Sequence, residues 1–353
     1  MPQPSPAEVA RVALSVAIHF VDFVDTNRTR SDCGWQHAAF MKGVVAVSRL
    51  ENVSTVQRAK LDSYVHAWGE GQRWECCNAR RVLAEGDGAN DMSCGSTYAE
   101  VWMAAAAKND TYLRSCRDDV LSAVVRRTRV DDWWWVDAHF MAMGTFARFG
   151  HITGDPRYHD KALALYRDSA DRRGLWSEPA GLYFRDASYF NRTSPHGASV
   201  FWGRGNGWAA GGLARALAYT PAGHPAFVVY SSRLRSLAAA AARLQSPDDG
   251  LWRASLLDPD SVPNPETTGS AGLLVGLAYG VRSGVLDRTA FLPVVVRAWH
   301  GLLRHAVRGT GALGYCQPVG AGPAPATPRD TSDFCVGLFL LAASEVALLS
   351  AVP

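Results

Sequence analysis

One pattern recurs along the chain and constrains its fold more than any other feature. An apolar stretch rich in alanine and glycine is followed by a short polar or glycine-containing connection, and then by a second stretch with apolar residues at helical spacing. In one copy, DAHFMAMGTFARFG leads through HITGDP into RYHDKALALYRDSA. Each such copy predicts two helices joined by a tight turn. The first stretches begin near residues 35, 91, 137, 206, 268 and 333.

The two stretches of a pair differ in how their apolar residues are distributed. The first is apolar almost all round, as in a helix buried on every side, whereas the second carries its charges in stripes. Six buried helices inside six amphipathic ones predict an all-α fold, an (α/α)6 toroid in which residues 1–353 form one barrel domain. A superhelical solenoid is the alternative. It is less favoured because the last helix is apolar and does not resemble a polar capping repeat.

The composition narrows the classes of partner. The chain has 353 residues, of which 48% are apolar and 20% charged, as is usual for a globular protein. The 36 basic and 33 acidic residues are spread along the chain without a Lys/Arg run, so a nucleic-acid partner is not expected. No apolar run approaches the roughly 20 residues of a membrane span, so no membrane partner is expected either.

The loops before the buried helices hold the unusual residues. In a toroid these loops meet at one end of the barrel, because all inner helices run the same way. One of them, residues 131–137, reads DDWWWVD. Neighbouring residues of a helix or strand point in different directions, so no single face buries three consecutive tryptophans. At least one indole is therefore expected on a surface that something else covers.

Charged residues in these loops indicate an acidic sugar as the ligand. The loops supply two aspartates, Asp91 and Asp137, and they supply Arg204 within FWGRGNGW. Helix N-termini add a positive potential that favours a carboxylate. In GRGNG the backbone can approach a sugar closely, with Arg204 and Asn206 as polar contacts. It is not a dinucleotide loop, because no strand precedes it and Trp208 replaces the third glycine.

Several segments together resemble a known family. WWWVDAHFM, TGDPRYHDKA, LYFRDASYF, FWGRGNGW, DGLWRASLLDP and ETTGSAG are similar, in this order, to the unsaturated glycuronyl hydrolases of glycoside hydrolase family 105, with more distant similarity to family 88. The resemblance covers roughly residues 35 to 350. It implies an (α/α)6 barrel, without a cofactor, that removes the terminal Δ4,5-unsaturated uronic acid from acidic oligosaccharides left by polysaccharide lyases.

The resemblance also implies roles for individual residues. Asp137 would be the general acid/base and Asp91 the second carboxylate. Arg185 and Asp186 stand where many members acting on rhamnogalacturonan have a histidine, and in this the chain looks more like members acting on glucuronate-ended side chains. The positions that match the lining of the sugar site are Trp135, Trp202, Arg204 and Trp208.

One aspartate can carry out both proton transfers in the hydrolysis of an unsaturated uronide. The substrate is an enol ether, so a carboxylic acid protonates C4 and positive charge develops at C5 and the ring oxygen. Water activated by the resulting carboxylate then adds at C5, and the hemiketal opens and expels the aglycone. The pKa of Asp137 must be raised for this, and both water-excluding indoles and a second carboxylate would raise it.

Other interpretations of the same residues stay open. Asp137 could lie in a helical first turn and simply favour the helix dipole, and Asp91 could be a turn or N-cap residue. Trp133 and Trp134 suit core or rim packing better than ligand contact. For the whole chain the alternatives are an inverting glycosidase acting on saturated sugars, with Asp137 and Asp91 as acid and base, and a non-catalytic sugar-binding protein. Neither histidines nor cysteines show metal-ligand spacing, so no metal is expected.

The compartment and the oligomeric state are left open by the sequence. The seven cysteines predict one or two disulfides if the protein is secreted, and otherwise buried thiols, which we favour for most of them. The first apolar stretch lacks a basic n-region and a small-residue cleavage site, so we do not expect it to be a signal peptide. Four of the eight asparagines nevertheless lie in N-x-[ST] sequons, where about one is expected by chance, and this indicates a secretory origin. These four are Asn27, Asn52, Asn109 and Asn191.

Overall fold

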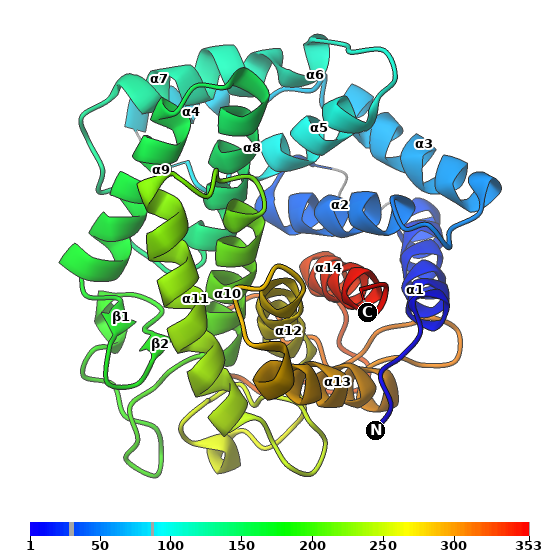
Figure 1. The fold of residues 1–353 in the computed structure, drawn as a ribbon, viewed down its shortest axis with the longest axis vertical. Coiled ribbons are helices and arrows are strands. Elements are labelled where there is room, and N and C mark those ends of the chain that lie inside the picture. Colours follow the sequence, from blue (N-terminus) through cyan, green and yellow to red (C-terminus); the bar gives the residue numbers. More distant parts are fainter. Residues whose placement is uncertain (28–31, 86–87, 353) are drawn as a thin grey trace.

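The computed structural model describes residues 1–27, 32–85 and 88–352, and the regular structure of these residues is almost entirely helical (Figure 1). A single two-stranded antiparallel sheet joins β1 (Trp176–Ser177) to β2 (Leu182–Tyr183). Short 3-10 turns form η4 (Ala187–Tyr189) and η5 (Pro259–Ser261). The helices account for the fold.

Six inner helices form a closed ring. They are α2 (Trp35–Ser48), α5 (Ser93–Ala104), α8 (Gly144–Thr153) with its preceding π-turn η2 (His139–Met143), α10 (Gly203–Leu217), α12 (Thr267–Arg282) and α14 (Asp333–Ser350). Each contacts the next, and α14 contacts α2 as well as α12, as Figure 1 shows. Because the last inner helix returns to the first, the fold is an (α/α)6 toroid. The prediction is confirmed, and the solenoid is excluded.

The outer helices lie against this ring. They are α1 (Pro6–Asn27), α3 (Thr55–Gly71), the continuous run α6 (Thr111–Arg114), η1 (Ser115–Leu121) and α7 (Ser122–Arg126), α9 (Arg157–Arg167) with η3 (Asp168–Arg172), α11 (Pro225–Leu244) and α13 (Arg288–His305). The first of them, α1, packs against the last inner helix, α14. A further short helix, α4 (Ala79–Glu85), lies in the connection between α3 and α5.

Glycines let the inner helices approach one another closely. A Cβ placed on Gly43 of α2 would lie 2.6 Å from the carbonyl oxygen of Gly337 in α14. Between α10 and α12, a Cβ on Gly207 would lie 2.8 Å from the carbonyl oxygen of Gly269. Real side chains do not tolerate such distances, so the glycine content of the first stretches is what permits the ring to close.

The last inner helix, α14, is long and apolar enough to cross a membrane by length and composition alone, contrary to the expectation that no apolar run comes near this length. However, 78% of its 18-residue window is buried inside the molecule. Its apolar surface is used by α2, α12 and α1, so we assign it as a core helix of the toroid.

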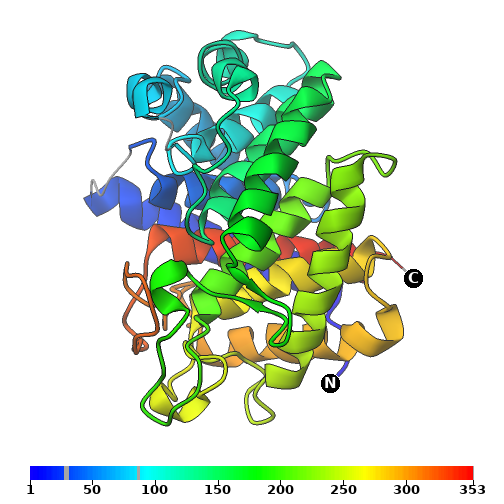
Figure 2. The same ribbon diagram turned by 90° about the vertical axis from the view of Figure 1, so that its left-hand side faces the viewer.

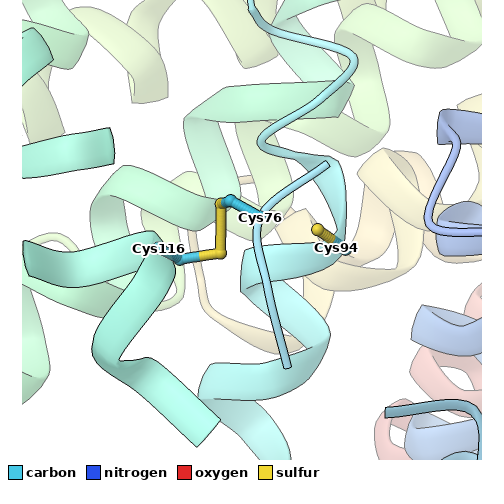
Figure 3. A group of neighbouring side chains, drawn as sticks. All are labelled: Cys76, Cys94 and Cys116. Atoms are coloured by element: carbon cyan, nitrogen blue, oxygen red, sulfur yellow. A yellow bond between two sulfur atoms is a disulfide. The ribbon is translucent and has the colours of Figure 1, made fainter. Parts of the chain in front are cut away.

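Three disulfides join six of the seven cysteines: Cys33–Cys77, Cys76–Cys116 and Cys316–Cys335. The expectation of mostly free buried thiols was therefore wrong, since only Cys94 is unpaired. Figure 3 shows Cys94 beside the Cys76–Cys116 disulfide, and the three sulfur atoms lie within 4.8 Å of one another. Because two of them are bonded together, this group offers a metal ion one thiol only.

The sequons lie at accessible positions where the structure describes them. Asn52, Asn109 and Asn191 are exposed, in connections outside the helices. The side-chain oxygen of Asn109 accepts a hydrogen bond from the backbone N–H of Thr111 (3.1 Å). The sequon of Asn27 extends into residues 28–29, which lie outside the described residues.

Candidate active site

The starts of the inner helices face one end of the barrel. In Figure 2, α14 begins on the left, next to the orange loop that precedes it, and green and yellow loops gather below. The segment before η2 pairs with the segment after β2: Trp135 and Asp186 form an isolated bridge, and the Val136 N–H donates to the carbonyl oxygen of Arg185 (2.8 Å). This backbone pairing places the guanidinium of Arg185 beside Asp137.

Asp137 is a buried carboxyl of this region whose pKa is raised. Burial raises its pKa above the ordinary value, whereas the positive charges of Arg185 and Arg204 oppose the shift and the negative charge of Asp186 adds to it. The Nε of Arg185 lies 3.8 Å from Oδ2 of Asp137. Oδ2 itself is buried and makes no hydrogen bond. Asp137 therefore combines a tendency to be protonated with an oxygen that no protein group occupies.

The three consecutive tryptophans have three different environments. Trp133 is fully buried and packs against Phe146, so it belongs to the core as expected. Trp134 is 42% exposed, and the guanidinium of Arg185 lies over its ring, 5.4 Å from the centroid. Trp135 is 5% exposed and contacts Trp134 with ring centroids 4.7 Å apart. Trp134 is thus the indole that a ligand could cover.

Arg204 is only 1% exposed, and the protein occupies most of its donors. Its Nη1 donates to the carbonyl oxygens of Gln317 (2.7 Å) and Pro318 (3.0 Å), and its Nη2 donates to that of Gly320 (3.2 Å). Its guanidinium also lies over the ring of Trp202, at 4.4 Å. Only Nε makes no hydrogen bond. Arg204 therefore holds the loop of residues 317–320, and its charge acts on Asp137.

The remaining members of FWGRGNGW are buried supports. The indole N–H of Trp202 donates to Oε1 of Gln317 (3.0 Å). Trp208 is fully buried and packs against Phe140. The side-chain amide of Asn206 accepts from the N–H of Tyr183 (2.8 Å) and donates to the carbonyl oxygens of Tyr183 and Trp202 (3.0 Å each). This corrects the expected polar contact between Asn206 and the sugar, because the backbone already uses both ends of the amide.

Asp91 occupies a different environment from the one expected. It is 5% exposed, its Oδ1 accepts from Nδ2 of Asn78 (2.8 Å), and its Oδ2 pairs with Arg81. It is not the N-cap of α5, which is Met92. The carboxylate whose charge raises the pKa of Asp137 is that of Asp186 rather than Asp91. Asp186 in turn pairs with Arg185 and accepts from the N–H of Ser188 (2.8 Å).

Two further residues act on Arg204 without having been assigned a role from the sequence. Glu266 is buried and caps α12, accepting from the N–H groups of Thr268 (2.8 Å) and Gly269 (2.6 Å), and its charge supports that of Arg204. The backbone carbonyl oxygen of Gln317 accepts from Arg204, and its side-chain oxygen accepts from the indole N–H of Trp202. Glutamate is not one of the residues preferred at an N-cap, so the segment ETTG does not announce the role of Glu266. Nothing near Gln317 in the sequence points to its contacts either. Among the described residues, only the cysteine trio groups three potential metal ligands.

Comparisons with known proteins agree with this architecture. A solved polysaccharide lyase is 30% identical, with a TM-score of 0.88 and coverage of 99% of both chains. A glycosyl hydrolase family 88 structure from Bacteroides vulgatus is 26% identical, with a TM-score of 0.87 and coverage of 98% of this chain and 100% of the other.

Curated relatives match over part of their length. The unsaturated 3S-rhamnoglycuronyl hydrolase of Alteromonas sp. (strain LOR) is 38% identical over 216 residues, which are 61% of this chain and 51% of that protein. The aligned stretch thus spans about half the length of that relative. The family model for Glycosyl Hydrolase Family 88 matches residues 11–349, and by this match over nearly its whole length the chain belongs to Glycosyl Hydrolase Family 88.

Proposed function

We propose that this protein is an unsaturated glycuronyl hydrolase that releases the terminal Δ4,5-unsaturated uronic acid from acidic oligosaccharides, with residues 1–353 acting as one catalytic domain. The observation that carries the proposal is the environment of Asp137, a buried carboxyl with a raised pKa, an oxygen without a hydrogen bond, and the positive charges of Arg185 and Arg204 acting on it. The relatives from Alteromonas sp. and Formosa agariphila, named unsaturated 3S-rhamnoglycuronyl hydrolases, support the substrate class. A closer affiliation with family 105 is part of the proposal.

The environment of Asp137 suits both halves of the reaction. Burial favours the neutral acid, which delivers its proton to C4 of the enol ether. Once the proton has left, Arg185 and Arg204 stabilise the carboxylate. The carboxylate then takes a proton from water as the water adds at C5. The hemiketal opens and expels the aglycone, and Asp137 is protonated again.

The substrate carboxylate needs a cation, and Arg185 suits this task better than Arg204. The terminal nitrogens of Arg204 donate to carbonyl oxygens and the residue is 1% exposed. The side chain of Arg185 is 19% exposed, and its Nη1 pairs with the carboxylate of Asp186. Arg185 also borders the exposed face of Trp134, on which a sugar ring can stack. Trp135, Trp202 and Trp208 then complete and support the wall of the site, and Asp91 anchors the loop before α5.

The test compares an unsaturated disaccharide with its saturated counterpart. The wild-type protein should consume only the unsaturated sugar, with loss of its ultraviolet absorbance, and in D₂O the released keto sugar should carry deuterium at C4. Asp137→Asn can neither donate nor accept the proton, so kcat should fall by about 10²- to 10⁴-fold with KM nearly kept. Asp62→Asn, which removes an outer-helix carboxylate, serves as the control.

Two results would contradict the proposal. Cleavage of saturated glycosides at a comparable rate would point to an ordinary glycosidase. A gain rather than a loss of ultraviolet absorbance on a saturated uronate polymer would indicate lyase activity, which matters because one structural relative is a polysaccharide lyase.

A further inference from the structure

Three of the four sequon asparagines lie in similar surroundings. Asn52 is in the connection between α2 and α3, Asn109 is in the connection between α5 and α6, and Asn191 comes two residues after η4. All three are exposed, and none belongs to a helix or a strand. A side chain that is to carry a bulky group needs such a position, because the group must remain in solvent once the chain has folded.

The side-chain nitrogens of these asparagines are not used by the protein. Within the part of the chain that the structure describes, Nδ2 of Asn52, Asn109 and Asn191 donates no hydrogen bond, and only Oδ1 of Asn109 accepts one, from a backbone N–H. Two asparagines outside sequons differ: Nδ2 of Asn78 donates to a carboxylate oxygen, and Nδ2 of Asn206 donates to two carbonyl oxygens. The sequon asparagines can therefore be modified at Nδ2 without the loss of a hydrogen bond.

Exposed apolar side chains stand next to two of the sequons. Val56, four residues after Asn52, is 81% exposed, and Phe190, directly before Asn191, is 37% exposed. Contact of such side chains with water is unfavourable. A hydrated group on the neighbouring asparagine would cover them and keep the surface soluble.

The disulfides indicate the compartment in which such a modification takes place. Three disulfides pair six of the seven cysteines. Disulfides form and persist in oxidising compartments such as the lumen of the endoplasmic reticulum, and N-x-[ST] sequons are the acceptors of glycans in secreted proteins. The cross-links and the excess of sequons therefore point to the same route, although they involve different residues.

We propose that Asn52, Asn109 and Asn191 carry N-linked glycans. In the transfer, Nδ2 bonds to C1 of the first sugar of an oligosaccharide held on a lipid diphosphate. The bond between C1 and the diphosphate oxygen breaks, the lipid diphosphate leaves, and the amide nitrogen gives up one proton. At Asn109 the hydrogen bond of Oδ1 persists, because only Nδ2 reacts. The proposal does not depend on the proposed function.

The three positions lie at both ends of the barrel. The connections of Asn52 and Asn109 follow inner helices, so they lie at the end opposite to the one where the inner helices start. Asn191 comes five residues after Asp186, at the end that carries the candidate site. Glycans on Asn52 and Asn109 therefore leave the candidate site accessible, and of the three only the glycan on Asn191 lies at its end of the barrel.

The test expresses the full chain behind a secretory leader in a eukaryotic host. All proteins carry Asn27→Gln, which removes the sequon that extends beyond the described residues. The secreted protein should be heavier than its sequence by three glycans. A peptide N-glycosidase, which converts each glycosylated asparagine to aspartate, should remove this excess, and peptide mapping by mass spectrometry should locate the conversions at positions 52, 109 and 191. Asn264→Gln, at an exposed asparagine outside a sequon, should leave three glycans.

Variants of the third sequon residue keep the asparagine itself. Thr111→Ala and Thr193→Ala should each remove one glycan, whereas Thr111→Ser and Thr193→Ser should keep it, because serine also completes the sequon. Each loss is read as a step in mass, so an effect on folding alone cannot imitate it. Secreted protein that has formed its disulfides but carries no glycan would overturn the proposal, and the absence of a glycan from one position would overturn the assignment of that position.

Discussion

At Asp137 two opposing effects meet, and in the proposed mechanism their balance decides how readily the carboxyl gives and takes a proton. Burial favours the protonated acid, whereas the nearby guanidinium groups of Arg185 and Arg204 favour the carboxylate. A group that first gives and then takes a proton needs both, because neither form should be so stable that it traps the enzyme. The exposed indole of Trp134 borders this pair of charges through Arg185.

Removing Arg185 should shift this balance in a measurable direction. The positive charge of Arg185 lowers the pKa of Asp137, so Arg185→Gln should raise that pKa further. In the proposed mechanism the acid form of Asp137 is the active one, so the alkaline limb of the pH profile of kcat/KM should move to higher pH. KM should also rise about 10- to 100-fold through the lost contact with the substrate carboxylate. The control is Arg243→Gln, at an exposed arginine of α11. An alkaline limb that is unshifted relative to this control would show that Arg185 does not act on Asp137.

The buried Lys42 gives a second test at the residue scale. It is fully buried in α2, its Nζ donates to the hydroxyl of Ser93 (2.6 Å), and burial lowers its pKa well below the usual value, with Arg148 and Arg215 adding to the effect. The unfolded chain, with a lysine pKa of about 10.4, therefore binds more protons, and the contribution of Lys42 to the free energy of unfolding rises with pH up to that value.

The expected outcome for Lys42→Met follows from this rise of the free energy of unfolding with pH. The variant should be more stable than the wild type near neutral pH, because an apolar chain of similar size removes the cost of burying an amine. The difference should shrink as pH rises toward about 10. Denaturant unfolding of both proteins across this range measures it, and a pH-independent difference would contradict the assignment.

The residues that sequence reasoning missed share one physical property: their role comes from pairing between distant segments. Asp186 acts on Asp137 because the strand-like segment after β2 pairs with the segment before η2. Gln317 meets Trp202 and Arg204 across more than 110 residues of chain. A local sequence pattern cannot predict such contacts. It does draw attention to Asp137, because the adjacent tryptophans and the start of a helix are local features.

At the scale of elements, the sequence patterns predicted the positions of the inner helices closely, but they did not predict which cysteines form disulfides. The inner helices were expected near residues 206 and 268 and begin at Gly203 and Thr267, because apolar periodicity marks a buried helix directly. The disulfides join cysteines 44, 40 and 19 residues apart, and which cysteines meet is decided by how the helices pack. The vicinal Cys76 and Cys77 even bond to different partners.

The Cys316–Cys335 disulfide connects helix α14 to the loop that holds Arg204 in the candidate site. It ties the loop that begins at Gln317 to the first turns of α14, and the carbonyl oxygens of that loop hold Arg204. Replacing both cysteines by serine should lower the free energy of unfolding by about 2–5 kcal/mol and raise KM, because Arg204 loses its fixed acceptors. Denaturant unfolding and steady-state kinetics measure the two effects.

The matched control for that variant is Cys76→Ser with Cys116→Ser. This disulfide joins the segment before α4 to η1 on the outside of the ring, so its loss should cost comparable stability while KM is kept. Equal increases of KM in both double variants would mean that general loosening, rather than the anchoring of the Arg204 loop, explains the effect.

For the whole molecule, closure of the ring is what gathers the site. Asp137 precedes η2, Arg204 lies in α10, and the acceptors of Arg204 precede α14, so these groups come from separate hairpins. They converge only if α14 returns to α2, and that contact is made through glycine. A Cβ on Gly337 would lie 2.7 Å from Cα of Phe40 and closer still to the carbonyl oxygen of Ala39, and backbone atoms of a buried helix cannot move aside as a flexible side chain can.

Gly337→Ala therefore tests closure with a single methyl group. Alanine favours a helix over glycine by about 1 kcal/mol, so intrinsic propensity alone predicts that the variant gains stability. The close approach of α2 predicts the opposite, a loss of about 1–3 kcal/mol from overpacking, together with lower activity because the Arg204 loop shifts with α14. Gly71→Ala, at the end of outer helix α3 where a Cβ meets nothing within 4 Å, should be neutral or stabilising. Denaturant unfolding of the two variants separates the effects: a gain of stability in Gly337→Ala would show that α2 and α14 can move apart, and that the ring does not depend on glycine at this contact.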